Sequence, residues 1–464
     1  MKTFVPILAA LLLAGCASAP PEGGFGDIQA TTRERLGREL IRERSAEDGE
    51  RIAARVRELL AKPLAADDAV QVALLNHRGL QAAFAELGIA EAELVQAGRL
   101  PNPGFSFGRA NKGDEREIER GLHFSLGRLL ALPFVVQVEQ RRAAATRAAV
   151  AAQVLTLAAE TRKAWVQAVA AGQTLHYARQ VMESAEASAE LARRMAEVGN
   201  FNPLQQAREQ SFYADAALNV ARAERQRLAA RERLTRLLGL WGEQTAFRLP
   251  DRLPDLPAAP EDRPDIERTA LAQRLDLQGA RAAVEQTARN LGLMRRTRLV
   301  NVFELGFKSI SSNEGPSERG WEIGLELPLF DWGDARVAKA EAIYMQALHR
   351  AAQAAVEARS EVREAYGAYR HAWDIARHQR DEVVPLKRRI SEENLLRYNA
   401  MLIGVFELLA DARAQIAAVS AAIEAQRDFW LAEADLQMAL VGKPSLMSPA
   451  GPAPAMAAGG GDPH

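Results

Sequence analysis

The chain has 464 residues, a formal net charge of −1 and a single cysteine. A nearly neutral chain has no global attraction to nucleic acid or to anionic surfaces, and one cysteine excludes a disulfide framework or a thiolate metal cluster within this chain. Charged residues make up 26% of the sequence and aromatic residues only 6%. This balance favours long helices and coiled coils over a compact mixed fold.

The N-terminus has the pattern of a secretory signal. Lys2 precedes an apolar run over residues 4–14, and small residues follow up to Cys16. The apolar run is too short for a comfortable membrane span, so residues 1–15 are predicted to be a signal peptide.

The stretch "LAGC" that ends at Cys16 resembles a bacterial lipobox. The resemblance implies that Cys16 is lipidated with palmitate and becomes the mature N-terminus, and that Ala17 directs sorting to the outer membrane. Residues 16–60 are then the lipid anchor, a tether and an N-terminal helical segment. The alternative is an ordinary cleaved signal with an incidental cysteine.

The body of the chain is a duplication. "NHRGLQAA" (76–83) has a counterpart in "QRLDLQGA" (273–280), and the offset of about 200 residues is far longer than a solenoid repeat. The sequence therefore predicts two repeats, at 61–240 and 264–442.

The two repeats are separated and followed by segments of different composition. Residues 241–263 form a proline-rich connector, because prolines cannot continue a helix. Residues 443–464 are rich in Pro, Ala and Gly and are predicted to be a disordered tail.

Both repeats follow one predicted plan of helix, β-hairpin, long helix and returning helix. The expected segments are a leading helix (about 67–98 and 264–298), two strands, a long helical run (134–198 and 335–400) and a returning helix (203–239 and 404–441).

The long runs carry apolar seams with a spacing of 3.5 residues, which indicates left-handed coiling against a partner helix. A soluble antiparallel coiled coil would show the same pattern. The seam positions are Val150, Val154, Leu157, Thr161, Ala164, Ala168, Ala171, Leu175, Ala178, Met182, Ala185, Ala189, Ala192 and Ala196, and then Ala340, Tyr344, Ala347, Ala351, Ala354, Ala358, Glu361, Ala365, Ala368, Ala372 and Ile375.

Four short segments alternate between apolar and polar residues, which predicts strands at about 102–111, 118–127, 301–309 and 320–328. Strands of about 9–11 residues with one apolar face match outer-membrane barrel hairpins. Four strands cannot close, so several chains must contribute to one barrel. The alternative is a pair of soluble hairpins that pack on a neighbouring domain.

Three motifs, in this order and duplicated context, resemble the TolC-like outer-membrane efflux proteins. They are "PLAADDAVQVALLNHRGLQAA" (63–83), "LPLFDWGDARVAKAEA" (327–342) and "RYNAMLIGVFELLADAR" (397–413). The second motif carries the strand-exit pattern Pro328, Phe330, Gly333 and Arg336. The resemblance implies a mainly α fold with a membrane β-barrel contribution: a homotrimer whose 12-stranded barrel continues as a coiled-coil helical tunnel.

The same resemblance implies a function and partners. The expected role is a passive outer-membrane channel of a tripartite efflux pump, which works with a periplasmic adaptor protein and an inner-membrane pump of RND type. The transported substrate, whether metal ion, drug or polypeptide, is left open. The alternative function is a lipid-anchored periplasmic coiled-coil scaffold without a pore.

The resemblance also locates the periplasmic tips, where an adaptor would dock, at the breaks that contain Gly199 and Gly404. Charged residues near these breaks are candidates for pairs between helices that hold the duct shut, although charged, solvated helix ends are the alternative. The candidate gate residues are Arg193, Arg194, Glu197, Glu392, Glu393 and Arg397.

No catalytic motif is found in the sequence. It lacks a phosphate-binding glycine loop, a nucleophile elbow and a His-Glu-x-x-His zinc motif. His371 and His378 could share a helix face, but no carboxylate or sulfur cluster joins them, which favours a solvated pair over a metal site. No enzyme activity, cofactor or resident metal is expected.

Overall fold

The computed structural model describes residues 23–297, 303–313, 315–325 and 329–444. The chain divides into two compact units. Unit 1 comprises Met1–Ala54, Leu74–Val154 and Leu275–Glu357, and unit 2 comprises Arg55–Ala73, Leu155–Arg274 and Ala358–His464. Each unit therefore contains segments from both halves of the sequence.

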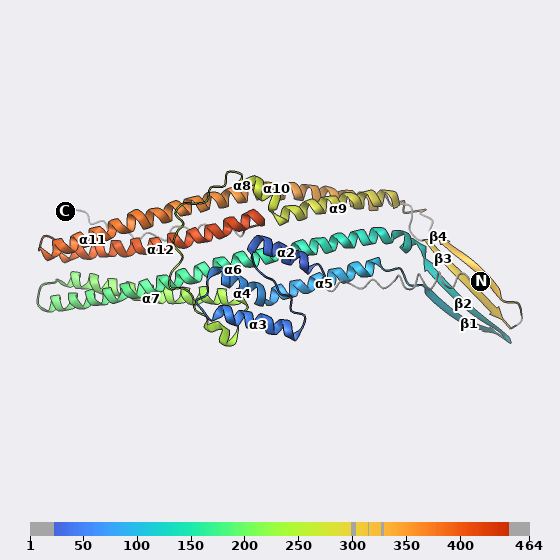
Figure 1. The fold of residues 1–464 in the computed structure, drawn as a ribbon, viewed down its shortest axis with the longest axis horizontal. Coiled ribbons are helices and arrows are strands. Elements are labelled where there is room, and N and C mark those ends of the chain that lie inside the picture. Colours follow the sequence, from blue (N-terminus) through green and yellow to red (C-terminus); the bar gives the residue numbers. More distant parts are fainter. Residues whose placement is uncertain (1–22, 298–302, 314, 326–328, 445–464) are drawn as a thin grey trace. The chain divides into compact units, whose positions relative to one another are not determined.

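Unit 1 contains a four-stranded antiparallel sheet in the order β1-β2-β3-β4 (Figure 1). The first hairpin is β1 (Gly104–Lys112) and β2 (Glu115–Ser125), and the second is β3 (Phe303–Ser312) and β4 (Glu318–Leu325). The two hairpins come from different halves of the chain and pair through β2 and β3.

All four predicted strands are present, but they lie further toward the hairpin turns than predicted. Ladder pairing extends β2 back to Glu115 and β3 on to Ser312, past polar residues that hide the alternation in the sequence. At the other end β2 stops at Ser125, because a helix begins at Leu126. Of the predicted strand residues, 301–302 and 326–328 lie outside the described residues.

Each predicted leading helix is in fact two helices, broken at equivalent positions of the repeated sequence, His77 and Arg274. Both residues have extended backbone, with ψ values of 113° and 125°. Nδ1 of His77 accepts a hydrogen bond from the Leu80 N–H (3.2 Å), which caps the second helix. Single helices at 67–98 and 264–298 were therefore a wrong prediction. The observed helices are α4 (Ala66–Asn76), α5 (Arg78–Gly98), α8 (Ile266–Gln273) and α9 (Leu275–Thr297).

The long run of the first half is a single helix, α6 (Leu126–Glu197), with 72 residues. It begins eight residues before the predicted start at 134 and contains Pro133 as its eighth residue. Pro133 lacks the N–H that would otherwise donate to the Leu129 carbonyl, so it removes one hydrogen bond within α6.

The long run of the second half is interrupted. It consists of α10 (Asp334–His378), a π-helical turn η2 (Gln379–Val383) and α11 (Val384–Asn399). Pro385 has no N–H to donate, and the Val384 N–H before it bonds to the Gln379 carbonyl, five residues back. The prediction of one helical run over 335–400 overlooked this proline and is wrong at the turn.

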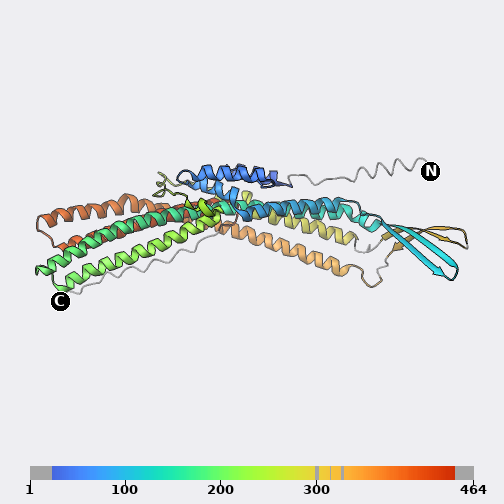
Figure 2. The same cartoon turned by 90° about the horizontal axis from the view of Figure 1, so that it is seen from below.

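Unit 2 contains two helical hairpins. α6 turns into α7 (Pro203–Leu238), and α11 turns into α12 (Val405–Val441). Both turns lie at the same end of unit 2 in the two views of Figures 1 and 2.

The predicted seam of α6 is confirmed, because all its positions are buried or half-buried. The seam of α10 differs from the prediction, since Ala368 and Ile375 are exposed. Tyr369 and Trp373 are buried instead, against Phe429 of α12. Aromatic side chains bury far more area than alanine, so they determine which face of the helix turns inward.

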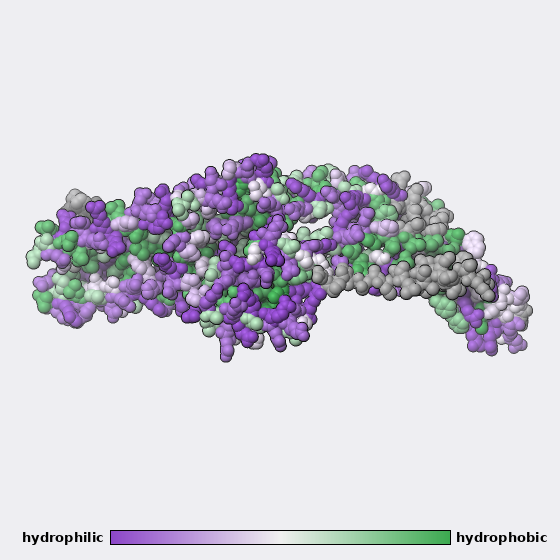
Figure 3. Space-filling view, in the orientation of Figure 1, coloured by the Kyte–Doolittle hydropathy of each residue, from purple (hydrophilic) through white to green (hydrophobic). Residues whose placement is uncertain are grey.

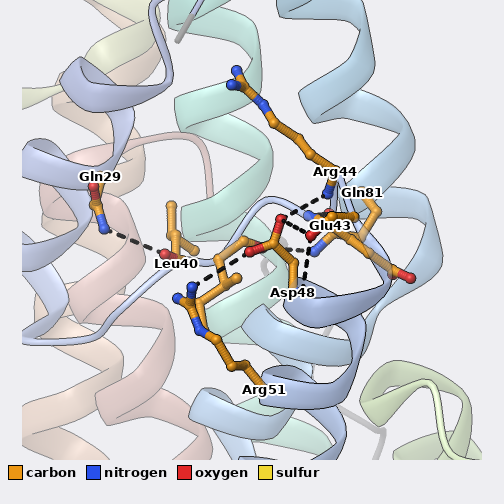
Figure 4. A network of polar contacts seen from close by, with 9 residues as sticks. Gln29, Leu40, Glu43, Arg44, Asp48, Arg51 and Gln81 are labelled. Atoms are coloured by element: carbon orange, nitrogen blue, oxygen red, sulfur yellow. Dashed lines mark hydrogen bonds and ion pairs between the residues drawn. The ribbon is translucent and has the colours of Figure 1, made fainter. Parts of the chain in front are cut away.

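The N-terminal segment packs on α5 within unit 1: the ring centroids of Phe25 and Phe84 are 5.0 Å apart, and Ile28 and Leu40 are buried. Gln81 of α5 holds the extended part of this segment with both ends of its amide (Figure 4). Its Oε1 accepts from the Glu43 N–H (3.0 Å), and its Nε2 donates to the Ile41 carbonyl (2.8 Å). The two helices of the segment are α2 (Phe25–Leu36) and α3 (Ala46–Leu60).

The proline-rich connector has one short 3₁₀ helix, η1 (Gly242–Ala246), and otherwise no regular structure up to residue 263. Indole N–H groups fasten it to unit 2: Trp430 donates to the Pro254 carbonyl and Trp373 to the Pro257 carbonyl, each at 3.0 Å. The connector is thus a fixed part of unit 2.

Candidate functional site

One face of the sheet carries an apolar row that crosses all four strands. The register places Phe105, Leu122, Phe307 and Trp321 side by side, and Phe124, Leu305 and Ile323 form the adjacent row. Phe105 is 68% exposed and Trp321 is 69% exposed. Figure 3 shows hydrophobic residues on the sheet next to a hydrophilic hairpin end. Exposed apolar rows of this extent indicate a surface that contacts another protein or lipid.

The opposite face carries mainly small and charged side chains, together with His123 and Ile310, and no Phe, Tyr or Trp. Lys308 and Glu119 form an ion pair across β2 and β3 (2.6 Å). Every glycine within the four strands lies on this face: Gly104, Gly108, Gly121, Gly306, Gly320 and Gly324.

Two of these glycines lie directly against side chains of the neighbouring strand. A Cβ at Gly104 would lie 2.1 Å from Nε2 of His123, and one at Gly121 would lie 2.3 Å from Oγ of Ser106. Small side chains on one face and large aromatic ones on the other favour a sheet that curves with its polar face inside.

The strand-exit segment is exposed and strongly apolar. Phe330 is 99% exposed, and Leu329 and Trp332 are also exposed. Gly333 has φ +75°, and its N–H donates to Oδ1 of Asp331 (2.8 Å), which stops the extended chain one residue before α10. The helix α10 then begins at Asp334, one residue before the predicted start at 335.

Of the other residues in the strand-exit pattern, Arg336 lies within the described residues and Pro328 does not. Arg336 lies in the first turn of α10, with Nη2 3.8 Å from Oδ2 of Asp331. Pro328 lies outside the described residues, as does Cys16.

The two hairpin turns of unit 2 place Gly199 and Gly404 differently. Gly199 has φ +81°, a left-handed conformation that suits glycine. In the second turn the left-handed residue is Met401, with φ +60°, whereas Gly404 is extended and precedes α12. Met401 is also 93% exposed, so an apolar side chain tops this turn.

The predicted gate residues pair within their own helices. Arg193 contacts Glu190 (2.8 Å) and Glu197, and Arg194 contacts Glu190 (2.8 Å), all on α6. These hydrogen bonds, first from Arg193 and then from Arg194, lower the pKa of Glu190 from 4.5 to about 2.

Within the described residues, the three candidate gate residues on α11 likewise form no contact that would hold the duct shut. Glu392 contacts Arg388 on α11 (2.9 Å), and Glu393 and Arg397 are exposed. In the described part of the chain, no ion pair joins any of the six candidates to another helix.

Other polar contacts do join different helices near these turns, and they were not predicted from the sequence. Nη2 of Arg413 in α12 donates to Oε1 of Glu209 in α7 (2.9 Å), and the guanidinium carbon lies 4.4 Å from the ring centroid of Phe212. Asn394 of α11 donates to Asp411 of α12. Glu209 has the pattern of an ordinary surface carboxylate in a charged helix, so its burial leaves no local signal.

A second polar network lies further along unit 2. Nζ of Lys163 is 2.9 Å from Oδ1 of Asp435 in α12 and 3.3 Å from Oε1 of Glu160, and Glu160 also contacts Arg233 of α7 (3.0 Å). Lys163 is only 5% exposed. Burial raises the pKa of Asp435, while the ammonium of Lys163 opposes that shift.

Arg274, the residue at the break between α8 and α9, is 1% exposed, and its Nη2 lies 2.7 Å from Oε2 of Glu361 in α10. Two buried ion pairs in one unit make removal of a single partner costly, because an uncompensated charge remains in a low-dielectric site.

Among the described residues, no group of three or more His, Cys, Asp or Glu side chains is arranged to hold a metal ion. His378 contacts Glu382 on the same face of its helix (3.2 Å). Across the described stretches of the chain, no helix combines the length with the apolar character that a membrane span requires.

Comparison with known proteins gives matches in structure only. No protein-family model matches the chain, and no curated protein matches it. The Campylobacter jejuni CmeC outer membrane channel is 18% identical, with a TM-score of 0.68 over 87% of this chain and 89% of that chain. The open state of the Neisseria gonorrhoeae MtrE outer membrane channel is 20% identical, with a TM-score of 0.67 over 81% and 88%.

A third neighbour, the outer membrane protein VceC from Vibrio cholerae, is 15% identical, with a TM-score of 0.67 over 86% of this chain and 99% of that chain. CmeC and MtrE are both outer membrane channels. At these identities the likeness concerns the fold, and this chain has the fold of the TolC-like outer-membrane channel proteins.

Proposed function

We propose that the chain is the outer-membrane channel of a tripartite efflux pump, a passive duct across the outer membrane and periplasm. The observation that carries this proposal is the two-faced sheet. An apolar row crosses all four strands on one face, and glycines and glutamates occupy the other. Such a sheet fits a barrel wall with lipid outside and water inside.

The edges of the sheet supply the argument for a trimer. β1 and β4 are its two outer strands, and an unpaired strand edge is very costly in lipid because its N–H and C=O groups have no partner there. Pairing β4 of one copy with β1 of the next removes every edge. Three copies give a closed 12-stranded barrel, which lies within the range of known membrane barrels.

The helices would continue the barrel as a coiled-coil tunnel in the periplasm. A straight helix of 72 residues such as α6 rises about 108 Å at 1.5 Å per residue. The seam of α6 repeats every 3.5 residues, which suits coiling with neighbours. No nucleotide-binding motif occurs in the sequence, so energy would come from an inner-membrane pump, proposed to be of RND type.

The turns of the two helical hairpins are the proposed contact with a periplasmic adaptor. Their exposed side chains include four large apolar ones: Val198, Leu204, Met401 and Leu402. Clustered apolar side chains that are exposed to water are unfavourable, so a protein partner that covers them would stabilise the turns.

Lipidation of Cys16 is proposed as a second membrane attachment. Labelled palmitate should enter the wild-type protein and not Cys16→Ser, and equal labelling of both would reject it. The variant should still assemble, because the barrel supplies its own attachment.

Conductance and stoichiometry of the full-length protein test the channel. We expect detergent-resistant trimers and stepwise currents in planar bilayers. Trimers without any conductance, or monomers that stay in the aqueous phase, would favour the periplasmic scaffold instead.

A further inference from the structure

The apolar face of the sheet carries positively charged residues toward the hairpin turns. Two residues beyond the row of Phe105, Leu122, Phe307 and Trp321, the register places Phe107, Arg120, Ser309 and Arg319 in one row. Arg109 and Arg116 lie on the same face, still closer to the turns. We call Arg109, Arg116, Arg120 and Arg319 the arginine rows.

These four side chains have no counter-charge on their own face. All are exposed, and within the described residues none has an ion-pair partner. The glutamates of the strands whose side chains are described lie on the opposite face: Glu117, Glu119, Glu304, Glu318 and Glu322. Like charges gathered on one face repel one another, so an anion from outside the chain would stabilise them.

The spacing suits an anion that several arginines approach together. Arg120 and Arg319 are separated by one strand, so their backbones lie about 9–10 Å apart at 4.7–4.9 Å per strand. Long arginine side chains can converge across that distance, and the planar guanidinium bonds phosphate through two parallel N–H groups. The adjoining aromatic row would hold the acyl chains of the same molecule.

We propose that the arginine rows bind the phosphate groups of lipopolysaccharide at the outer surface of the outer membrane. The proposal rests on the proposed function, which puts this face against lipid and the hairpin turns outside the cell. An apolar surface with cationic residues at one border is complementary to a lipid with acyl chains and a phosphorylated head. The free phosphate ion, which has no acyl chain, would lack the aromatic part of the contact.

Binding of diphosphorylated lipid A to the purified full-length protein in neutral detergent tests the proposal. Each arginine near an anionic lipid surface contributes about fivefold in affinity, so the triple variant Arg109→Gln/Arg120→Gln/Arg319→Gln should bind about one hundredfold more weakly. The matched variant with Lys at the same three positions keeps the charge and should bind within about tenfold of wild type. Adduct counting by native mass spectrometry gives both values.

Three outcomes overturn the proposal: unchanged affinity in the Gln variant, equal binding of dephosphorylated lipid A, or complete displacement by an equimolar amount of inorganic phosphate. Conductance of the same preparations in neutral bilayers is the separate readout for the channel. A conducting protein with unchanged lipid affinity in the Gln variant rejects only the lipid site. A non-conducting protein that still loses lipid A binding in that variant rejects only the channel.

Discussion

Arg413 of α12 donates to the carboxylate of Glu209 in α7 at 2.9 Å, and so joins the two halves of the chain close to the turns of their hairpins. The two partners differ in environment. Glu209 is 2% exposed, whereas the side chain of Arg413 is 38% exposed and stacks on Phe212. The pair therefore depends on the arginine to compensate a buried negative charge.

Removal of the arginine should be more damaging than removal of the carboxylate charge. Arg413→Met leaves Glu209 buried without compensation and should lower the free energy of unfolding by about 3 kcal/mol. Glu209→Gln leaves a cation that can reach water and should cost about 1 kcal/mol. Denaturant unfolding measures both, with Arg208→Gln as control, because Arg208 is an exposed arginine next to Glu209 in α7. Equal losses in the two variants would contradict the asymmetry.

The buried pair of Lys163 and Asp435 should respond to pH when it is broken. Lys163→Met leaves Asp435 without its ammonium partner, and the variant should lose about 3 kcal/mol at pH 7. Burial already raises the pKa of Asp435, so the lone carboxyl can take up a proton and the loss should shrink toward pH 4. Replacing both residues, Lys163→Met with Asp435→Leu, should restore most of the stability. Thermal unfolding at the two pH values separates these cases, and a loss that does not depend on pH would exclude protonation of Asp435.

The fold could be predicted from the sequence where a pattern repeats locally. The apolar seam of α6 and the alternation in the four strands are both periodic patterns in the sequence, and the structure contains both. The predictions are wrong where a single residue has more influence on the local structure than the periodic pattern around it. Pro385 forces the π-helical turn η2, and Tyr369 and Trp373 rotate the buried face of α10.

The polar contacts between helices were less accessible to sequence analysis. The charges near the hairpin turns were candidates for gate pairs between helices. Instead, Arg193 and Arg194 pair with Glu190 on their own helix, because residues three and four positions apart are nearest neighbours on a helix surface. Glu209 and Arg413 are far apart in the sequence and become partners only through tertiary packing. Their separation of 204 residues leaves no pattern from which the pair could be predicted.

Glu433 on α12 should make stability depend on pH with a defined sign. Burial raises its pKa above 4.5, so the folded state holds the proton more tightly than the unfolded state. Its stabilising effect is therefore complete below pH 4.5 and is lost as the pH rises through the folded-state pKa. Glu433→Gln should match wild type near pH 4 and exceed it in unfolding temperature at pH 7. The exposed Glu424→Gln on the same helix controls for the lost charge, and a constant difference at all pH values would be the contrary result.

Met401 stores backbone strain in the turn between α11 and α12, because its φ of +60° is unfavourable for a residue with a Cβ. Met401→Gly should relieve that strain and raise the free energy of unfolding by about 1 kcal/mol. The opposite change at the extended Gly404, Gly404→Ala, adds a Cβ and should have a much smaller effect, since the φ of Gly404 is −83°. Destabilisation by Met401→Gly would mean that the exposed thioether makes a contact that outweighs the strain.

The orientation of the sheet can be tested with neighbouring residues on β4. Ile323 lies on the apolar face, beside Leu305, and Glu322 lies on the polar face, beside Gly306. An arginine on the lipid side near the bilayer midplane costs roughly 2–4 kcal/mol, and a trimer incurs this cost three times. Ile323→Arg should therefore lower the outer-membrane yield and the melting temperature of the trimer on a semi-native gel.

Glu322→Arg is the matched variant, one residue away and with the same new side chain. A water-filled lumen accepts the charge at little cost, so this variant should assemble normally and shift the reversal potential of single channels toward anions. Damage from Glu322→Arg with normal assembly of Ile323→Arg would show that the sheet faces the other way. Normal assembly of both variants would remove this sheet from the membrane, and the chain would then act as a periplasmic scaffold.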